Sequence, residues 1–351
     1  MLEEAMQRFA DKPAFRCFGE TLTYEDIHWL SRDFAVWLQR RLEVKKGQRI
    51  AVMLPNIPAF PIAMLGILRA GAAQVNVNPL YTARELEHQL NDAGVETIII
   101  SNASTPTLAE IIGKTGVKTV ITVAHGDATS ATIACPSADA RLANAIRFAD
   151  ALAGGAKLEF APVPLTGDDL LFLQYTGGTT GLSKGAALSH RNLVANAEQF
   201  KAFLYDALQP GEAVVVTALP LYHIFALMVN FICTFSRGAE NWLVPNPRDM
   251  DGFVEILRRA RCTFLTGVNT LYSGLVAHPK IREVDFSRLR HAIGGGASVM
   301  PVTSARWKTL TGCDIIEGYG LSETSPVLTL NDALPKSAVG KILRKDLRAI
   351  A

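Results

Sequence analysis

The sequence predicts an α/β protein with two doubly wound, mainly parallel sheets. With 351 residues, the chain is long enough to fill two large domains. Apolar residues make up 49% and charged residues 19%, as in globular proteins. Short β-rich runs alternate with helix-like runs in two separate stretches, which is typical of βαβ units. We therefore expect one α/β subdomain over residues 1–165 and a second over residues 166–330.

The first alternating stretch begins at Arg49. It reads RIAVML (strand), PAFPIAMLGILRAG (helix), AAQVNVN (strand), TARELEHQLNDAG (helix) and VETIIIS (strand). Thr82 and Glu85 form a capping box at the start of the second helix, and Gly94 ends that helix. Residues 124–169 are rich in Ala, Ser, Thr, Gly and Pro, which indicates a surface excursion or linker.

The second stretch begins with LLFLQYT and a helix that starts at Ser189. It continues with AVVVTAL (strand), an apolar helix after Tyr222, NWLVP (strand), MDGFVEILRRAR (helix), and the strands TFLTG, LRHAIGGG and CDIIEGYG. Ligands of doubly wound sheets bind beyond the carboxyl ends of the strands, so the chemistry is expected where these strands end.

Composition excludes several classes of protein. The net charge of +2 indicates no nucleic acid partner. The five cysteines (Cys17, Cys135, Cys233, Cys262 and Cys313) have no metal-ligand spacing and indicate buried thiols in a reducing cytoplasm. The first residues lack the pattern of a signal peptide, and the apolar runs are shorter than the ~20 residues that span a bilayer. We expect a cytoplasmic protein whose membrane contact, if any, is peripheral at the inner membrane face.

A loop rich in glycine and hydroxyl groups follows LLFLQYT. Its candidate ligand-binding residues are Tyr175, Thr176, Gly177, Gly178, Thr179, Thr180, Gly181, Ser183, Lys184 and Gly185. Glycines let successive backbone N–H groups point inward, so such a loop can enclose a polyphosphate such as that of ATP. It is not a Walker loop. The Walker motif GxxxxGK[ST] needs a glycine directly before its lysine, and here Ser183 precedes Lys184.

Two alternatives use the same loop residues. Gly181–Gly185 matches the GxSxG nucleophile elbow, which would make Ser183 the nucleophile of a serine esterase. An elbow needs a strand that runs directly into its first glycine, and here glycines and threonines intervene. The other alternative is a surface loop without a ligand.

YTGGTTGLSKGA resembles the phosphate-binding motif of the adenylate-forming superfamily, which includes acyl-CoA synthetases. The segments ALPLYHIFAL, GGGAS and EGYGLSETSP agree with the superfamily in order and spacing. VNVNPLYTARELEHQLNDAG and LPLYHIFALMVN are most similar to bacterial long-chain fatty acyl-CoA ligases. The resemblance implies that a fatty acid and MgATP give an acyl-adenylate, from which the thiol of CoA displaces AMP.

The resemblance also implies residue roles. Thr180, Glu323 and Lys341 would be catalytic, with Glu323 also holding Mg²⁺. The nucleotide would contact Tyr319 through its adenine, Thr324 through its α-phosphate, and also Gly295, Gly296, Ala297 and Gly320. His223 and Gly294 would face the acyl substrate. Taken without the motif, Glu323 is an ordinary surface acid and His223 a hydrogen-bonded core histidine.

The sequence departs from the family pattern after residue 330. Residues 331–351 resemble the family's last motif, with Lys341 as its lysine, but the intervening segment with the ribose-binding Thr-Gly-Asp is absent. We therefore interpret residues 331–351 as a remnant of the mobile C-terminal domain, most of which is missing, next to an internal deletion. Asp168 lies in a Thr-Gly-Asp that precedes the phosphate loop, so we interpret it as a loop residue. Lys341 alone is one charge in a basic tail.

The resulting hypothesis is a long-chain fatty acid–CoA ligase, shortened and impaired, that uses ATP, Mg²⁺ and CoA. A non-catalytic protein that binds ATP or an acyl group is the main alternative. The sequence leaves the acid's chain length and the oligomeric state open.

Overall fold

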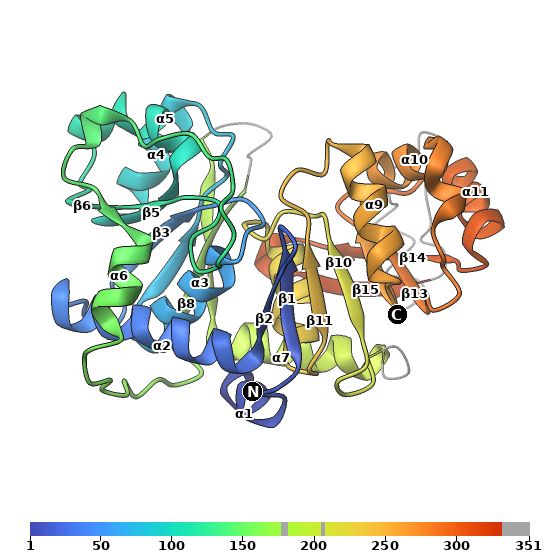
Figure 1. Cartoon of the computed structure of the whole chain (residues 1–351), viewed down its shortest axis with the longest axis horizontal. Coiled ribbons are helices and arrows are strands. Elements are labelled where there is room, and N and C mark those ends of the chain that lie inside the picture. The colour runs from blue at the N-terminus through green and yellow to red at the C-terminus, as the bar shows by residue number, and fades with distance from the viewer. Residues whose placement is uncertain (177–181, 205–207, 332–351) are drawn as a thin grey trace.

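The described residues of the computed structural model, 1–176, 182–204 and 208–331, form two sheets flanked by helices (Figure 1). The first sheet has the strand order β7-β6-β5-β3-β4-β8-β9, and the second has the order β15-β14-β13-β12-β10-β11-β1-β2. Pairing is parallel except at β8–β9, β14–β15 and β1–β2. The predicted α/β fold with two doubly wound sheets is confirmed.

The first sheet contains β3 (Arg49–Met53), β4 (Ala73–Asn76), β5 (Thr97–Ser101), β6 (Thr119–Val123), β7 (Ile146–Arg147), β8 (Leu170–Thr176) and β9 (Lys184–Ser189). The helices of this half are α1 (Leu2–Arg8), α2 (Tyr24–Arg41), α3 (Ala59–Arg69), α4 (Ala83–Asp92), α5 (Thr105–Ala109), α6 (Phe148–Gly155) and α7 (His190–Phe203). Short 3₁₀ turns cover Asn102–Ser104, Ile112–Lys114 and Ala140–Leu142.

The second sheet contains β1 (Pro13–Cys17), β2 (Glu20–Thr23), β10 (Val214–Thr217), β11 (Glu240–Leu243), β12 (Phe264–Gly267), β13 (His291–Gly294), β14 (Ile315–Gly320) and β15 (Val327–Asn331). Its helices are α8 (Ile224–Ala226), a π-helix (Leu227–Cys233), α9 (Met250–Ala260), α10 (Asn269–Ala277) and α11 (Pro301–Thr311). Two 3₁₀ turns cover Pro279–Glu283 and Ser322–Thr324.

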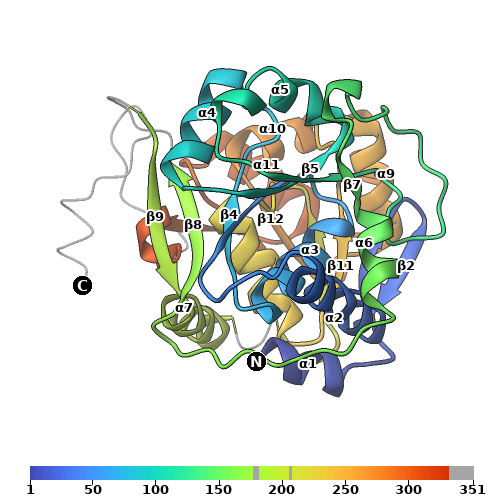
Figure 2. The ribbon, with the colours of Figure 1, turned by 90° about the vertical axis from the view of Figure 1, so that its left-hand side faces the viewer.

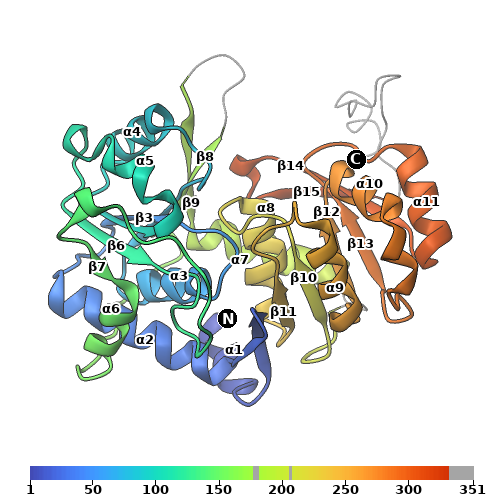
Figure 3. The ribbon, with the colours of Figure 1, turned by 45° about the horizontal axis from the view of Figure 1, so that its top comes forward.

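The strands are apolar on both faces because both sheets are covered on both sides. In β3, Ile50 and Val52 join a core shared with the second sheet, whereas Ala51 and Met53 face the core under α4 and α5. In β10, Val215 faces the shared core and its neighbours face the core under α9, α10 and α11. Figure 3 shows α3 and α7 between the two sets of strands. The result is a layered α–β–α–β–α arrangement with the central helices common to both sheets.

Sheet membership does not follow the expected order along the chain. The strand LLFLQYT was expected in the second sheet, but β8 pairs with β4 of the first, and the hairpin β8–β9 forms the edge of that sheet (Figure 2). Conversely, β1 and β2 belong to the second sheet through the pairing of β1 with β11. The expectation that the two sheets follow one another along the chain was therefore wrong. The division into subdomains at residues 1–165 and 166–330 stays a prediction.

Two further expectations are refined by the structure. Within residues 124–169, expected to be a surface excursion or linker, β7 and α6 are regular, and α6 packs against α2. The capping box at α4 is confirmed, with Thr82 accepting a hydrogen bond from the Glu85 backbone. Ser189 caps α7 in the same way.

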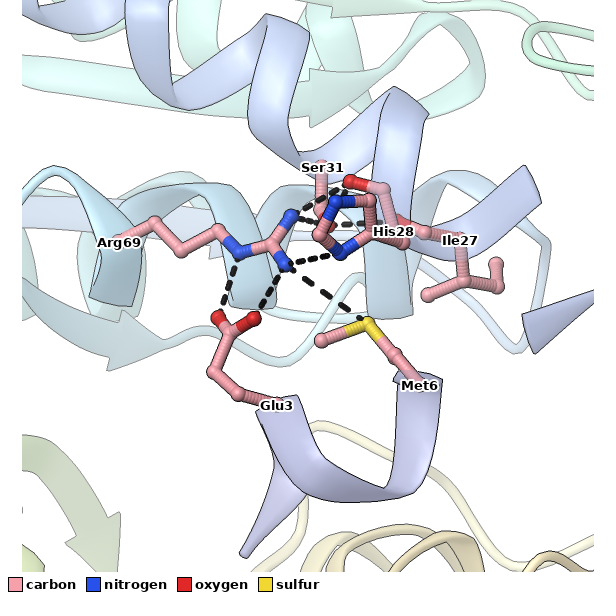
Figure 4. A network of polar contacts seen from close by, with 6 residues as sticks. All are labelled: Glu3, Met6, Ile27, His28, Ser31 and Arg69. Atoms are coloured by element: carbon pink, nitrogen blue, oxygen red, sulfur yellow. Dashed lines mark hydrogen bonds and ion pairs between the residues drawn. The ribbon is translucent and has the colours of Figure 1, made fainter. Parts of the chain in front are cut away.

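The guanidinium of Arg69 joins α1, α2 and α3. It binds both carboxylate oxygens of Glu3 at 2.7 and 2.6 Å and donates to the Ser31 hydroxyl at 2.7 Å (Figure 4). Only 7% of the Arg69 side chain is exposed, and a bidentate carboxylate is the partner that a buried guanidinium needs. The His28 ring nitrogen lies 2.9 Å from the same guanidinium, so α1 is fastened to the helices below the first sheet.

Three cysteines are buried as expected, and burial raises the pKa of Cys17, Cys233 and Cys262 to about 12. Cys135 and Cys313 are only half-buried, which corrects the expectation for those two. None of the helices in the described part of the chain combines the length and apolar character needed to cross a bilayer.

Candidate nucleotide and acyl site

Small-molecule sites usually have volumes of about 300–1,000 Å³, and a cavity of ≈ 580 Å³ lies beyond the carboxyl ends of the second sheet's strands. It is lined by Thr176, His223, Ile224, Phe225, Gly295, Gly296, Gly318, Tyr319, Gly320, Leu321, Ser322, Glu323, Pro326, Val327 and Leu330. Seven of the predicted site residues are among them: Thr176, His223, Gly295, Gly296, Tyr319, Gly320 and Glu323. The cavity therefore lies where doubly wound sheets bind ligands.

Glycines at the end of β13 keep the cavity open. A Cβ atom on Gly295 would lie 2.9 Å from the ring of Phe225, so a larger residue would displace that ring. Gly296 has φ of +74°, a backbone conformation that favours glycine. Gly294 is buried, and a Cβ there would lie 2.4 Å from Val299, so this predicted substrate residue packs behind the cavity. Ala297 is exposed and outside the lining.

His223 stands at the start of α8, where it caps the helix. Its Nδ1 accepts a hydrogen bond from the Phe225 backbone at 3.2 Å, so the neutral ring carries its proton on Nε2. Desolvation by the surrounding protein lowers the pKa of His223 below its ordinary value. At neutral pH this side chain is a neutral imidazole in an otherwise largely apolar wall.

Tyr319 lies near the end of β14 and is half-buried, and Glu323 lies in the turn after that strand and is exposed. Thr324, predicted to bind the α-phosphate, does not line the cavity. Its hydroxyl is used within its own turn, donating to the carbonyl of Pro326 at 2.6 Å and accepting from the N–H of Leu321 at 2.9 Å. The hydroxyl-bearing residue of this turn that does line the cavity is Ser322.

The described residues beside the predicted phosphate loop are held by the β8–β9 hairpin. Thr176 pairs with Lys184, and Gly185 packs under Tyr175, whose ring would lie 2.9 Å from a Cβ at that position. The Tyr175 hydroxyl donates to Asp92 at 2.5 Å; burial, and next this hydrogen bond, raise the pKa of Tyr175. Tyr175, Ser183, Lys184 and Gly185 thus stand outside the cavity lining.

The β8–β9 hairpin also argues against the esterase alternative. A nucleophile elbow is a strand–turn–helix, but the residues after Ser183 form β9 and pair with β8. The Ser183 carbonyl accepts a hydrogen bond from His88 of α4 at 2.9 Å, which is a backbone contact. Asp168 is a loop residue as expected, paired with Arg191 at 3.0 Å.

Several predicted residues lie outside the described part of the chain: Gly177, Gly178, Thr179, Thr180, Gly181 and Lys341. Their roles stay predictions.

Glu323 suits a magnesium ion shared with phosphate oxygens. Residues 1–176, 182–204 and 208–331 contain no group of three or more His, Cys, Asp or Glu side chains that could hold a metal alone. Mg²⁺ at nucleotide sites commonly takes one or two carboxylates and completes its shell with phosphates and water. A single exposed carboxylate at the cavity rim fits that chemistry.

Sequence reasoning missed some of the cavity wall. Val327 and Leu330 line it, yet they read as ordinary core residues in the sequence. Ser322 was overlooked because Thr324 offered a hydroxyl in the same motif. Only the fold shows which of these side chains reach the cavity.

Comparisons with known proteins agree on the family. The model of the AMP-binding enzyme family matches residues 2–349. The long-chain-fatty-acid–CoA ligase of Escherichia coli O6:H1 is 45% identical over 342 residues, covering 94% of this chain and 61% of the relative. The ligase of the same name from Bacillus subtilis is 33% identical over 354 residues, covering 97% and 62%. The chain therefore spans about three fifths of the length of these curated relatives.

Solved structures show the same fold. The anthranilate CoA ligase AuaEII with anthranoyl-AMP superposes with a TM-score of 0.82 at 20% identity, covering 97% of this chain and 66% of that one. ATP-bound MatB from Rhodopseudomonas palustris gives a TM-score of 0.78 at 25% identity, covering 97% and 67%.

Proposed function

Since the chain belongs to the AMP-binding enzyme family, we propose that its cavity binds ATP beside a fatty acid and supports formation of an acyl-adenylate, as part of a long-chain fatty acid–CoA ligase. The observation that carries this proposal is that the glycines after β13, Tyr319 of β14 and Glu323 of the turn after β14 line one cavity. The Escherichia coli relative, by its name, acts on long-chain fatty acids and CoA. MatB, by its title, binds ATP.

On the nucleotide side, we assign the adenine to Tyr319 and Gly320 and the phosphates to Thr176 and the following loop. The hydroxyl nearest the α-phosphate is assigned to Ser322, because Thr324 is held by its own turn. Mg²⁺ bound to Glu323 would neutralise charge that develops on the phosphates. In the reaction the acid's carboxylate oxygen attacks the α-phosphorus and diphosphate leaves.

On the acyl side, the wall is formed by Phe225, Ile224 and Leu330, with the neutral His223 at its edge. An apolar wall with few polar groups suits the hydrocarbon chain of a fatty acid. CoA would then attack the acyl-adenylate through its thiol, with release of AMP. We retain Lys341 and Thr180 as catalytic proposals, and the inner membrane face as the proposed place where the acid is met.

The test is ATP binding by calorimetry, followed by exchange of labelled diphosphate into ATP in the presence of palmitate and Mg²⁺. Replacing Thr179 and Thr180 together by valine removes charge-assisted hydrogen bonds worth ~1.5 to 3 kcal/mol each, so ATP affinity should fall at least about tenfold. Thr309→Val on α11, an exposed threonine remote from the cavity, is the matched control. A wild-type chain that binds neither ATP nor palmitate would overturn the proposed function.

A further inference from the structure

We propose that Gln174 is a positioning residue that couples the nucleotide side of the cavity to its acyl side. The inference rests on the proposed function, and it concerns a buried chain of amide side chains that reaches from the first sheet to the backbone beside His223. Gln174 lies on β8, two positions before Thr176 of the cavity lining.

The chain consists of three amides in a row. Gln74 Nε2 donates to Asn76 Oδ1 at 2.6 Å, and Asn76 Nδ2 donates to Gln174 Oε1 at 3.0 Å. Gln174 Nε2 then donates to the carbonyl of Tyr222 at 3.1 Å. All three side chains are buried, with exposed fractions of 0%, 3% and 3%. Head-to-tail hydrogen bonds polarise one another, so the chain is stronger than three separate contacts.

The direction of the chain is set at its Tyr222 end. A backbone carbonyl only accepts, so Gln174 must present its amide nitrogen there and its oxygen to Asn76. The same constraint passes to Asn76 and then to Gln74, whose Oε1 is buried and has no hydrogen-bond partner among the described residues. A buried polar atom without a partner is unfavourable, so the arrangement favours the Tyr222 contact over complete satisfaction of Gln74.

The contact ties two walls of the cavity together. Asn76 and Gln174 are cross-strand neighbours in the β4–β8 pair, so Gln174 is fixed to the first sheet and moves with β8. Tyr222 directly precedes His223, and the His223 ring holds the N–H of Phe225. Phe225 in turn packs where a Cβ on Gly295 would stand. A shift of β8 at Thr176 when the nucleotide binds is thereby transmitted through Gln174 to the acyl wall.

The experiment measures palmitate affinity by calorimetry with and without α,β-methylene-ATP, an analogue that cannot transfer its α-phosphate. Coupling between two sites commonly amounts to about 5- to 150-fold in affinity. In the wild-type chain the analogue should change the palmitate Kd at least about fivefold, and Gln174→Met should reduce that factor below about twofold. The Kd of the analogue alone should stay within about threefold, because Gln174 does not line the cavity.

Gln89→Met is the matched control. Gln89 is equally buried, and its Nε2 donates to the backbone carbonyl of Asn76 at 2.8 Å, but it is not in the path to Tyr222. This variant should keep the wild-type coupling. Gln174→Glu adds a pH readout: an ionised carboxylate cannot donate to the Tyr222 carbonyl, whereas a protonated one can, so coupling should return as the pH falls.

The outcomes separate the two proposals. Full coupling in Gln174→Met, or equal loss in Gln89→Met, overturns the positioning role. If Gln174→Met does not fold, Gln174→Glu gives the test instead. Coupling in Gln174→Glu that is the same at every pH overturns the positioning role. Wild-type binding of both ligands without coupling overturns the positioning role alone, and binding of neither ligand overturns the proposed function with it.

Discussion

Tyr319 is half-buried in the cavity wall at the end of β14, where a ring can cover one face of a base. Tyr319→Phe keeps that ring and should bind ATP as the wild type does. Tyr319→Ala should weaken ATP by about 5- to 150-fold, because aromatic stacking on a base contributes ~1 to 3 kcal/mol. Calorimetry on the three proteins checks this, and equal affinities would remove Tyr319 from the site.

Gly295 controls the volume available to an acyl chain through Phe225. Gly295→Ala places a methyl group 2.9 Å from the Phe225 ring, and overpacking of this kind costs ~1 to 3 kcal/mol. Palmitate should therefore bind about 5- to 150-fold more weakly. Gly295→Ala combined with Phe225→Leu frees the space again and should recover most of the affinity. A double variant as weak as the single one would show that the loss has another origin.

At this scale the sequence predicted the residue types of the site better than their orientation. His223, Gly295, Tyr319 and Glu323 line one cavity, and their roles there stay predictions. Tyr175 lies in the same motif as Thr176, yet alternation along β8 turns it toward Asp92 instead. Side-chain direction within a motif depends on strand register and turn geometry, which short spacing does not encode.

The elements next to the site are stabilised by helix caps and by hydrogen bonds between neighbouring elements. The capping box of α4 positions His88, which donates to the Ser183 carbonyl and so supports the β8–β9 hairpin. Helix starts and strand runs follow from local capping and periodicity, and for this reason the bounds of α4 and β5 and the start of α7 are close to those predicted. The π-helix Leu227–Cys233 was not predicted, because an apolar run looks the same at either helical period.

Removal of the α4 cap should lower the free energy of unfolding by an amount that depends on pH. Thr82→Ala should lower the free energy of unfolding by ~1 kcal/mol at pH 7. Hydrogen bonds from the Thr82 backbone and then its hydroxyl hold the pKa of Glu85 below its ordinary value of 4.5. Because the folded-state pKa is the lower one, this contribution is present above pH 4.5 and is lost as the pH falls through the folded-state value.

Urea unfolding of the wild type and of Glu85→Gln at pH 7 and at pH 3 tests the direction of this pH dependence. The difference between the two proteins should be larger at pH 7 and shrink in acid. A difference that grows on acidification would contradict the assignment of the cap to an ionised Glu85.

At the scale of the whole molecule, Asn56 connects the two sheets. It follows β3 of the first sheet, and its amide donates to the carbonyls of Thr217 and Leu219 at 3.0 and 2.9 Å and accepts from the N–H of Leu221 at 2.8 Å. These contacts hold the segment that leads to His223. Only 4% of Asn56 is exposed, so water does not replace them.

Asn56→Ala should lower the free energy of unfolding by ~3 kcal/mol, since three backbone groups lose their partner. Palmitate binding should weaken as well, because the segment before His223 is released. Asn91→Ala removes an exposed amide that donates to Lys114 at 3.0 Å, and it should change the unfolding free energy by less than ~1 kcal/mol. Chemical denaturation of both variants makes the comparison, and similar losses would argue against a special role for Asn56.

The overall architecture was predicted only to the level of two sheets. The assignment of each strand to its sheet was not predicted, because the pairing of β1 with β11 joins residues that are remote in the sequence. Periodicity reports that a segment is a strand and which faces are apolar, but it carries no information about a distant partner. β8 illustrates the same limit, since its position beside β4 depends on the shared core.

The exchange of edge strands has a consequence for synthesis on the ribosome. Arg16 of β1 pairs with Glu240, 224 positions later in the chain. At ~5 to 20 residues per second, the β1–β2 hairpin emerges roughly 10 to 45 seconds before β11 is available to receive it. For that interval its edge and apolar face are open to other chains, so the nascent protein is expected to depend on a chaperone that covers this hairpin until the second sheet is complete.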